Sequence, residues 1–207
     1  MDIGALRDAL VVAMLPHVTF DGWSEGAMAE AAHDLGLDPT MPARVFPGGP
    51  AEAVELFVDY ADRTMAADLA ALLADNPGMR MGDRVFNAVK LRLERWQAER
   101  EPVRRALALL ALPHNLPLAA RLTWRTADAI WAACGDRSHD FSWYTRRSTL
   151  AAVYAATVLY WLDDGSEGAA DTWAFLKRRL GDVQKLPKLT GRFSGVAEKL
   201  ARRFPGR

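Results

Sequence analysis

Residues 24–46 have the sequence SEGAMAEAAHDLGLDPTMPARVF, which favours two short helices joined by a tight turn. Small and apolar residues recur at helical spacing as far as Leu35, and Gly36 then allows the chain to turn sharply. Asp38 can cap the second helix, with Pro39 at its first position, where a missing N–H leaves no hydrogen bond unmade. The segment therefore predicts the geometry of a helix-turn-helix.

The charge of this segment argues against DNA binding. From Phe20 to Pro50, five acidic residues and one basic residue, Arg44, give a net charge of −4. DNA binding depends on Lys and Arg side chains that neutralise phosphates. At the start of the expected recognition helix, Thr40 is the one side chain able to bond a base edge. We therefore expect a degenerate helix-turn-helix that is kept for packing, and no nucleic-acid partner.

The rest of the chain also has the period of α-helices, because apolar residues recur every three or four positions and Gly or Pro separates the blocks. The uncharged stretch from Ser148 to Leu162 would form about 22 Å of helix, too short for a bilayer core of roughly 30 Å. It is interpreted as a buried helix. We predict an all-α protein with helices near residues 3–15, 24–35, 39–46, 50–74, 80–97, 101–112, 116–134, 140–163, 168–185 and 189–204.

The overall composition is that of an ordinary globular protein. The 207 residues include 26 Lys and Arg and 26 Asp and Glu, so the net charge indicates neither nucleic acid nor an acidic partner. The single cysteine, Cys134, excludes an internal disulfide and fits a reducing compartment. The first residues, MDIGALRDAL, lack the cationic start and cleavage site of a signal or transit peptide. We expect a cytoplasmic protein.

A search for catalytic and metal-binding patterns is mostly negative. Glu30 and His33 have the Glu-x-x-His spacing of di-iron bundles, but no second copy occurs, so we interpret them as one exposed helix face. His17, His114 and His139 fall at predicted helix ends or loops, with no Cys or carboxylate at ligand spacing. The sequence contains no Gly-rich phosphate loop and no nucleophile elbow. We predict that the protein is not an enzyme and has no metal or cofactor.

The C-terminal tail carries the opposite charge. From Lys177 to Arg207, ten basic and two acidic residues give a net charge of +8. An apolar stripe at helical spacing, flanked by bases, predicts a membrane-binding helix through Leu189, Arg192, Phe193, Val196, Lys199, Leu200, Arg203 and Phe204. The apolar side chains would enter the headgroup boundary while the bases meet anionic lipid. The same stripe could pack on the body of the protein, and periodicity does not choose between these alternatives.

The two predicted helices over residues 116–134 and 140–163 contain most of the apolar bulk. The first is apolar on more than one side, so neighbours should cover it from several directions. The second combines Ala151, Ala152, Ala155 and Ala156 with larger apolar residues. Such small residues allow a tight core, a dimer seam or a ligand cavity, and the pattern leaves all three open.

Two stretches resemble a known family: residues 135–154, GDRSHDFSWYTRRSTLAAVY, and residues 171–179, DTWAFLKRR. Two shorter stretches near the N-terminus, Phe20–Ser24 and Val45–Gly49, match in the same order along the chain. On these motifs, over roughly residues 5–205, the chain resembles the coenzyme Q protein nine family of ubiquinone biosynthesis.

The resemblance implies a TetR-like fold, a homodimer formed near the C-terminus, a bound isoprenoid or phospholipid, and a final membrane-binding helix. The expected division is a helix-turn-helix-like subdomain over 1–48, a lipid-binding and dimerisation domain over 49–187, and an amphipathic helix over 188–207. The implied function is a lipid-binding accessory protein that presents ubiquinone intermediates to a hydroxylase. The alternative is a TetR-like transcriptional regulator with a hydrophobic ligand. The expected location is bacterial, in the cytoplasm and peripheral on the inner membrane.

Two sets of site residues accompany this resemblance. In eukaryotic members a surface patch docks the demethoxyubiquinone hydroxylase, and the matching positions here are Ile130, Trp131, Asp140, Trp143, Tyr144 and Arg147. Trp143 and Tyr144 are adjacent on a helix and cannot both face the core. From their faces and positions, the expected lipid-binding residues are Phe86, Val89, Leu93, Leu122, Leu150, Val153 and Tyr154.

Overall fold

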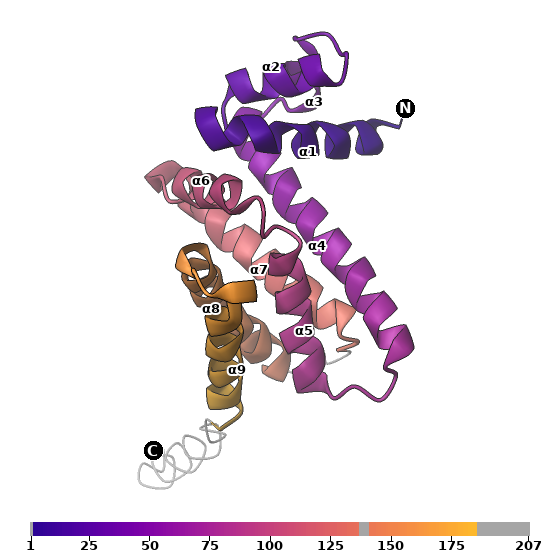
Figure 1. Ribbon diagram of the computed structural model, residues 1–207, viewed down its shortest axis with the longest axis vertical. Coiled ribbons are helices and arrows are strands. Elements are labelled where there is room, and N and C mark those ends of the chain that lie inside the picture. Colours follow the sequence, from indigo (N-terminus) through magenta and orange to yellow (C-terminus); the bar gives the residue numbers. More distant parts are fainter. Residues whose placement is uncertain (1, 137–140, 186–207) are drawn as a thin grey trace, which may run out of the picture.

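The computed structural model describes residues 2–136 and 141–185, and within these ranges the protein consists of helices without strands (Figure 1). The prediction of an all-α protein is confirmed. The α-helices are α1 (Ile3–Asp21), α2 (Glu25–Asp34), α3 (Met41–Val45), α4 (Gly49–Asp75), α5 (Met81–Glu94), α6 (Arg100–Leu110), α7 (Leu116–Ala133), α8 (Phe141–Asp163) and α9 (Ala170–Lys185). The predicted helix over 189–204, with its membrane-binding residues, lies outside the described residues.

Helices α1, α2 and α3 form a small layer at one end of the molecule (Figure 1). The Ser24 side chain caps α2 by accepting a hydrogen bond from the Ala27 N–H at 3.1 Å. After α2, Gly36 has a φ of +66°, a conformation that glycine adopts without strain, and the chain turns there as predicted. The sequence signals at both ends of α2 thus act through local backbone geometry.

Helix α1 is longer than predicted, because Pro16 does not end it. Pro16 is exposed and has no N–H to donate to the Val12 carbonyl. Val12 is also on the solvent side, so water can bond this carbonyl instead. Among the described helices, α1 is the one long and apolar enough to cross a membrane. Its apolar residues Leu10, Val11 and Met14 are buried in the core, which accounts for this composition.

Helix α3 is shorter than predicted, and the expected cap at Asp38 is wrong. The helix begins at Met41 after Thr40, whose side chain makes no capping bond. The Asp38 carboxylate instead accepts hydrogen bonds from the backbone N–H and the hydroxyl of Thr40, both at 2.7 Å. Asp38 therefore stabilises a turn before the helix, a common role for a short acidic side chain.

The long helix α4 leads from the N-terminal layer along the body of the molecule, where α5 to α9 pack together (Figure 1). Helix α7 lies among α4, α5, α6 and α8, as its apolar composition predicted. The largest side chains of the core that are completely buried include Trp161, Met65 and Ile130. Close packing of such side chains, through burial of apolar area, supplies most of the stabilisation of a helical domain of this size.

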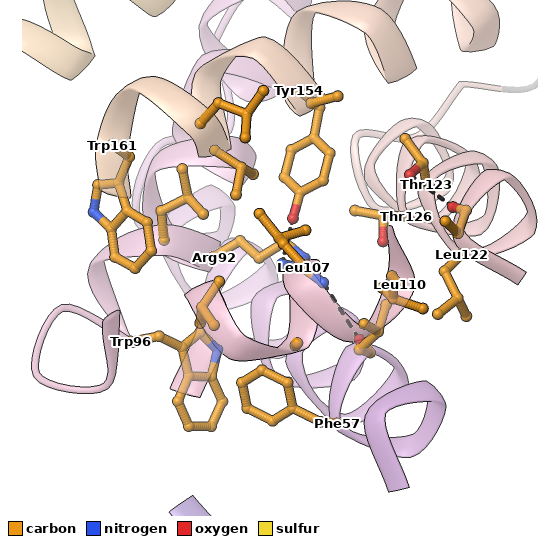
Figure 2. A pocket seen from close by; sticks show the side chains of 18 of the residues that line it. Phe57, Arg92, Trp96, Leu107, Leu110, Leu122, Thr123, Thr126, Tyr154 and Trp161 are labelled. Atoms are coloured by element: carbon orange, nitrogen blue, oxygen red, sulfur yellow. Dashed lines mark hydrogen bonds between the residues drawn. The ribbon is translucent and has the colours of Figure 1, made fainter. Parts of the chain in front are cut away.

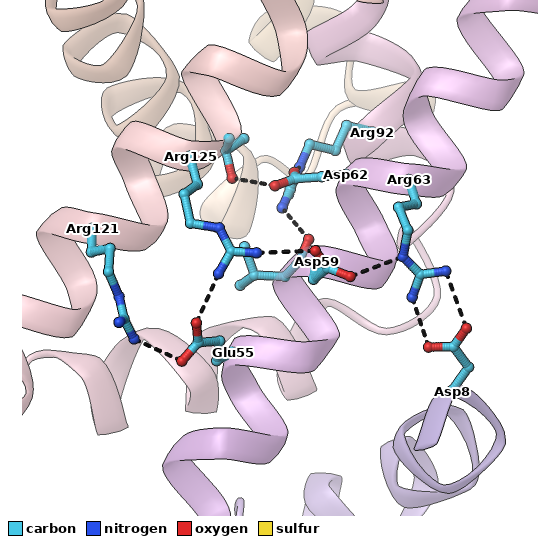
Figure 3. Close-up of polar contacts among 10 residues, drawn as sticks. Asp8, Glu55, Asp59, Asp62, Arg63, Arg92, Arg121 and Arg125 are labelled. Carbon is cyan, nitrogen blue, oxygen red and sulfur yellow. Dashed lines mark hydrogen bonds and ion pairs between the residues drawn. The ribbon is translucent and has the colours of Figure 1, made fainter. Parts of the chain in front are cut away.

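A chain of ion pairs connects α1, α4 and α7 along one side of the molecule (Figure 3). Arg63 pairs with Asp8 of α1 at 2.7 Å and with Asp59 of its own helix at 2.8 Å. The network continues across to α7 through Arg125–Asp59 at 3.0 Å, Arg125–Glu55 at 2.7 Å and Arg121–Glu55 at 2.7 Å. Single exposed pairs contribute little, but a connected network fixes the relative positions of the helices that it joins.

Candidate functional site

An apolar cavity of about 310 Å³ lies among helices α4 to α8 (Figure 2). This volume is at the lower end of the range of ligand pockets, roughly 300 to 1,000 Å³. Its lining is almost entirely hydrophobic, and Arg92 is the charged residue in it. The lining residues are Phe57, Val58, Arg92, Leu93, Trp96, Val103, Ala106, Leu107, Leu110, Ala111, Leu116, Ala119, Leu122, Thr123, Thr126, Tyr154, Ala155, Val158, Leu159 and Trp161.

Aromatic rings form one wall of the cavity. The rings of Phe57 and Trp96 meet edge to face with centroids 4.9 Å apart, and Phe57 also contacts Trp23 at 5.5 Å. Trp161 is completely buried and donates its indole N–H to Gln97 Oε1 at 2.9 Å. These contacts hold the rings in place, so the cavity does not close by rotation of one side chain.

A buried polar group is also part of the lining. The Arg92 guanidinium donates from Nε to Asp62 Oδ1 at 2.7 Å and from Nη1 to the Tyr154 hydroxyl at 2.5 Å. Thr126 donates to the second oxygen of Asp62 at 3.0 Å. Burial alone would lower the pKa of Arg92, but the contacts with Tyr154 and Asp62 outweigh it and raise that pKa. Arg92 is therefore charged, and Asp62 balances it.

The cavity reaches the surface between the start of α7 and the second half of α8. Four of its lining residues are exposed, namely Ala111 and, at this mouth, Leu116 at 53%, Ala155 and Leu159 at 61%. The lining then continues inward to the fully buried Trp161.

The structure brings together some of the expected lipid-binding residues and separates the others. Leu93, Leu122 and Tyr154 line the cavity. The other four, Phe86, Val89, Leu150 and Val153, are not part of its lining and pack in or against the core. For Phe86, Val89 and Leu150 the physical reason is position along the helices, because the cavity lies near the end of α5 and beside the second half of α8. Val153 is adjacent to Tyr154 but lies on another side of α8.

Helix α6 supplies a wall of the cavity that the sequence reasoning missed. Val103, Ala106, Leu107 and Leu110 all line it from this helix. Their spacing of three, one and three residues is that of one face of an amphipathic helix, and this signal was available in the sequence. It could have indicated an apolar face, but not whether that face met a cavity or another helix.

The aromatic residues at the start of α8 lie close together. Tyr144 is 61% exposed and Trp143 is half-buried, so the expectation that both cannot face the core agrees with their placement. Their ring centroids are 4.6 Å apart, and the Arg147 guanidinium stacks 4.0 Å from the Trp143 centroid. Trp124 of α7 contacts both rings, at 5.9 and 6.4 Å. These four residues are called the Trp-Tyr cluster below.

Other residues of the expected partner-binding patch have different surroundings. Ile130 is completely buried and Arg147 is 3% exposed, so neither offers a surface to a partner. Arg147 pairs instead with Asp128 and Asp136, and its guanidinium stacks on the Trp143 ring. Trp131 is half-buried and donates its indole N–H to the Arg146 carbonyl at 3.3 Å. Asp140 lies outside the described residues.

Titratable groups elsewhere do not form an evident reactive site. Within residues 2–136 and 141–185, no group of three or more His, Cys, Asp or Glu side chains is placed to hold a metal ion. His33 of the Glu-x-x-His spacing is exposed, and His17 contacts Asp34 at 2.7 Å. Burial raises the pKa of the Cys134 thiol to about 12, so this cysteine is protonated at neutral pH.

Comparisons with known proteins agree on one family. A COQ9 family model matches residues 116–187. The chain is 32% identical over 206 residues to the human "Ubiquinone biosynthesis protein COQ9, mitochondrial", covering 97% of this chain and 64% of the relative. The Drosophila melanogaster protein of the same name is 32% identical over 205 residues, covering 98% of this chain and 62% of the relative. The chain thus spans somewhat less than two thirds of the length of these relatives.

A solved structure supports the fold. A TetR transcriptional regulator from Nitrosomonas europaea superposes with a TM-score of 0.70 at 22% identity, covering 88% of this chain and 99% of that chain. At this identity the likeness concerns the fold alone. The prediction of a TetR-like helical fold is confirmed by this superposition.

The relatives also correct one prediction. The expected location, in a bacterial cytoplasm and on a bacterial inner membrane, is contradicted because the relatives from human, cattle, fly and Dictyostelium are all named as mitochondrial. The prediction relied on the composition of the first residues. Those residues carry no information on location when the chain corresponds to only part of its relatives.

The matched motifs, the identity along nearly the whole chain and the helical architecture lead to one assignment. This chain is similar to the COQ9 proteins along nearly its whole length and has its helices arranged in a TetR-like fold.

Proposed function

We propose that this chain acts in ubiquinone biosynthesis as a non-catalytic accessory protein that binds an isoprenoid or other lipid intermediate and presents it to a hydroxylase at a membrane. The observation that carries the proposal is the apolar cavity with its open mouth beside α8. An isoprenoid chain is a branched hydrocarbon, and transfer of apolar surface from water to such a cavity is favourable by about 25 cal/mol for each Å² buried.

The names of the relatives support the pathway, since the human and fly proteins are called ubiquinone biosynthesis proteins. The Trp-Tyr cluster supports the docking step, because Trp and Tyr are among the residue types most enriched in binding hot spots. Of its side chains, Tyr144 is the most exposed and would contact a hydroxylase directly. The membrane step rests on the sequence of the tail alone.

A transcriptional regulator is the alternative function for a TetR-like fold. The net charge of −4 over residues 20–50 disfavours it, because phosphate contacts would be few. The five-residue α3 is also short for a recognition helix, and Arg44 is its single base. A shift of the protein's own promoter DNA in gel electrophoresis would favour the regulator over the accessory protein.

The proposal is tested by blocking the cavity. Ala119 of α7 lines it and is half-buried, whereas the adjacent Ala120 is exposed and outside the lining. We expect native mass spectrometry to find lipid bound to the wild-type protein and to the Ala120→Trp variant, and little or none bound to Ala119→Trp. Both variants should keep the helical content of the wild type in circular dichroism. If organic extraction of the wild-type protein yields no lipid, or if Ala119→Trp retains as much as the control, the lipid-binding function fails.

A further inference from the structure

The polar group at the cavity consists of the lining residues Arg92 on α5, Tyr154 on α8 and Thr126 on α7, together with Asp62 on α4, which bonds to Arg92 and Thr126 but is not part of the lining. Arg92, Asp62 and Thr126 are at most 7% exposed, and Tyr154 is 9% exposed. Figure 2 shows the Tyr154 hydroxyl directed at Arg92 in the middle of the lining side chains. Buried polar groups are costly unless they are hydrogen-bonded. Their presence in an otherwise apolar cavity therefore requires an explanation.

Hydrogen-bond donors remain unused in this group. The Tyr154 hydroxyl accepts a bond from Arg92, and in the described part of the chain no acceptor is found for its own proton. Burial raises the pKa of Tyr154, so this proton is present at neutral pH. Arg92 donates one bond each from Nε, Nη1 and Nη2, the last a long one of 3.4 Å to the Val58 carbonyl. Each terminal nitrogen of a guanidinium carries two hydrogens. One hydrogen on Nη1 and one on Nη2 are therefore still available to bond a ligand.

The charge of the group is balanced internally. Asp62 uses one oxygen for Arg92 and the other for Thr126. The ion pair of Arg92 and Asp62 therefore leaves the unused Arg92 donors at the cavity without an excess positive charge. An anionic ligand would lose its hydration in this apolar surrounding without gaining an unpaired cation, whereas a neutral acceptor oxygen would satisfy the free donors.

We propose that Tyr154 and Arg92 form a hydrogen-bonding site for the neutral carbonyl or quinone oxygen of a ligand whose hydrocarbon part fills the rest of the cavity. The inference rests on the proposed lipid-binding function and makes it more specific. The aromatic side chains of Phe57, Trp96 and Trp161 line the same cavity and suit the hydrocarbon part or a ring of such a ligand. The site thus selects by the head of the ligand, and the apolar walls bind its tail.

The test compares two ligands that differ in one group. Geranylacetone is a neutral ketone with a branched hydrocarbon chain, and its partner is the hydrocarbon in which a methylene replaces the carbonyl. The full chain, freed of its own lipid, is dialysed against both, and the bound amounts are measured by gas chromatography. We expect the wild-type protein to bind the ketone about tenfold more tightly than the hydrocarbon, as a good hydrogen bond to a charged donor pair allows.

The Tyr154→Phe variant removes the hydroxyl and keeps the ring. We expect its preference for the ketone to fall severalfold while its binding of the hydrocarbon is unchanged. Tyr160→Phe is the matched control, because Tyr160 lies on the same helix, stacks on Phe175 and is not part of the cavity lining. Its preference should equal that of the wild type. Arg92→Lys keeps a cation beside Asp62 but lacks the planar guanidinium, so its preference for the ketone over the hydrocarbon should also fall. This variant replaces Tyr154→Phe in the test if Tyr154→Phe does not fold.

The outcomes separate this inference from the function on which it rests. Equal binding of both ligands by the wild type, or an unchanged preference in folded Tyr154→Phe and Arg92→Lys proteins, overturns the head-group site and leaves the apolar cavity in place. Binding of neither ligand overturns the lipid-binding function together with the inference. A third ligand, the carboxylate of the same chain length, tests the assignment to a neutral head, and tighter binding of this carboxylate than of the ketone overturns that assignment.

Discussion

At the scale of single residues, the Asp164 side chain bonds the first turn of α9 although Asp164 lies six residues before that helix begins. Its carboxylate accepts hydrogen bonds from the backbone N–H and hydroxyl of Ser166, at 2.8 and 2.6 Å, and from those of Thr172, at 2.8 and 2.5 Å. Thr172 lies in the first turn of α9, where backbone N–H groups lack helical partners. Burial alone would raise the pKa of Asp164, but these four bonds outweigh it and hold that pKa well below the ordinary value.

We predict that Asp164→Asn lowers the free energy of unfolding at pH 7 by about 1 to 3 kcal/mol, the effect of losing hydrogen bonds to a charged acceptor. Chemical denaturation followed by circular dichroism measures this. The control is Asp163→Asn, because Asp163 has a side chain that is 78% exposed and pairs with Arg104 on the surface. Its loss should change stability by at most about 1 kcal/mol.

The pH dependence of Asp164 has a definite sign. A carboxyl whose pKa is lower in the folded protein than in the unfolded chain stabilises the fold above its unfolded value, here about 3.9. That contribution is lost as the pH falls below this value toward the folded pKa. The difference between the wild type and Asp164→Asn should therefore be constant from about pH 5 to 8 and shrink below about pH 4. A difference that grows on acidification would contradict this account.

At the scale of single elements, the C-terminal segment is predicted from its sequence to be the membrane anchor. Full burial of each of its large apolar side chains, Leu189, Phe193, Leu200 and Phe204, would be worth about 1.5 to 3 kcal/mol. An isolated helix of about fifteen residues is marginal in water, so ordering it offsets part of this gain. Reversible binding to anionic membranes should result, and it should weaken with salt, because the Debye length shrinks to roughly 3 Å at 1 M.

Deletion of residues 188–207 should abolish flotation with anionic liposomes and leave the thermal melt unchanged. A Phe193→Ser and Phe204→Ser double variant retains every base and should bind far more weakly than the wild type if apolar insertion contributes as predicted. Flotation of the truncated chain at the wild-type level would place the anchor elsewhere. Unfolding of the truncated chain would instead mean that the stripe packs on the body of the protein.

At the scale of the whole molecule, the exposed face of α8 is unusually apolar. Ala152, Ala156 and Tyr160, the last 40% exposed, follow one another at four-residue spacing on this face, and Ala155 and Leu159 at the cavity mouth lie outside it. Small side chains let two helices approach closely, and a two-fold symmetric pair would cover this face on both copies. We therefore expect a homodimer in solution, formed through α8.

Sedimentation at micromolar concentration should give a species of twice the 22.8 kDa mass of one chain. Ala156→Arg places a charge in the middle of the expected interface and should shift the protein to a monomer. Ala67→Arg on the exposed side of α4 is the matched control and should remain dimeric. A wild-type protein that sediments as one chain, or an Ala156→Arg variant that stays dimeric, would refute the dimer through α8.

The local structure of this protein follows from residues that are close together in the sequence. Apolar spacing and Gly or Pro breaks located the helices, and Ser24 and Gly36 marked the ends of α2 correctly, because capping and turn geometry depend on residues close in sequence. Errors arose where the environment changed a local preference. Pro16 is tolerated within α1 because it faces solvent, and Asp38 forms a turn because Thr40 lies within reach.

Which helix faces contact one another depends on residues that are far apart in the sequence. Arg92 pairs with Asp62 across 30 positions and with Tyr154 across 62, and no periodicity encodes such a pairing. Ile130 and Arg147 belong to the predicted partner-binding patch but are buried, whereas Tyr144 of the same patch is exposed. Helical period fixes the side of a helix on which a residue lies, but the crossing of the helices determines whether that side meets core, cavity or solvent.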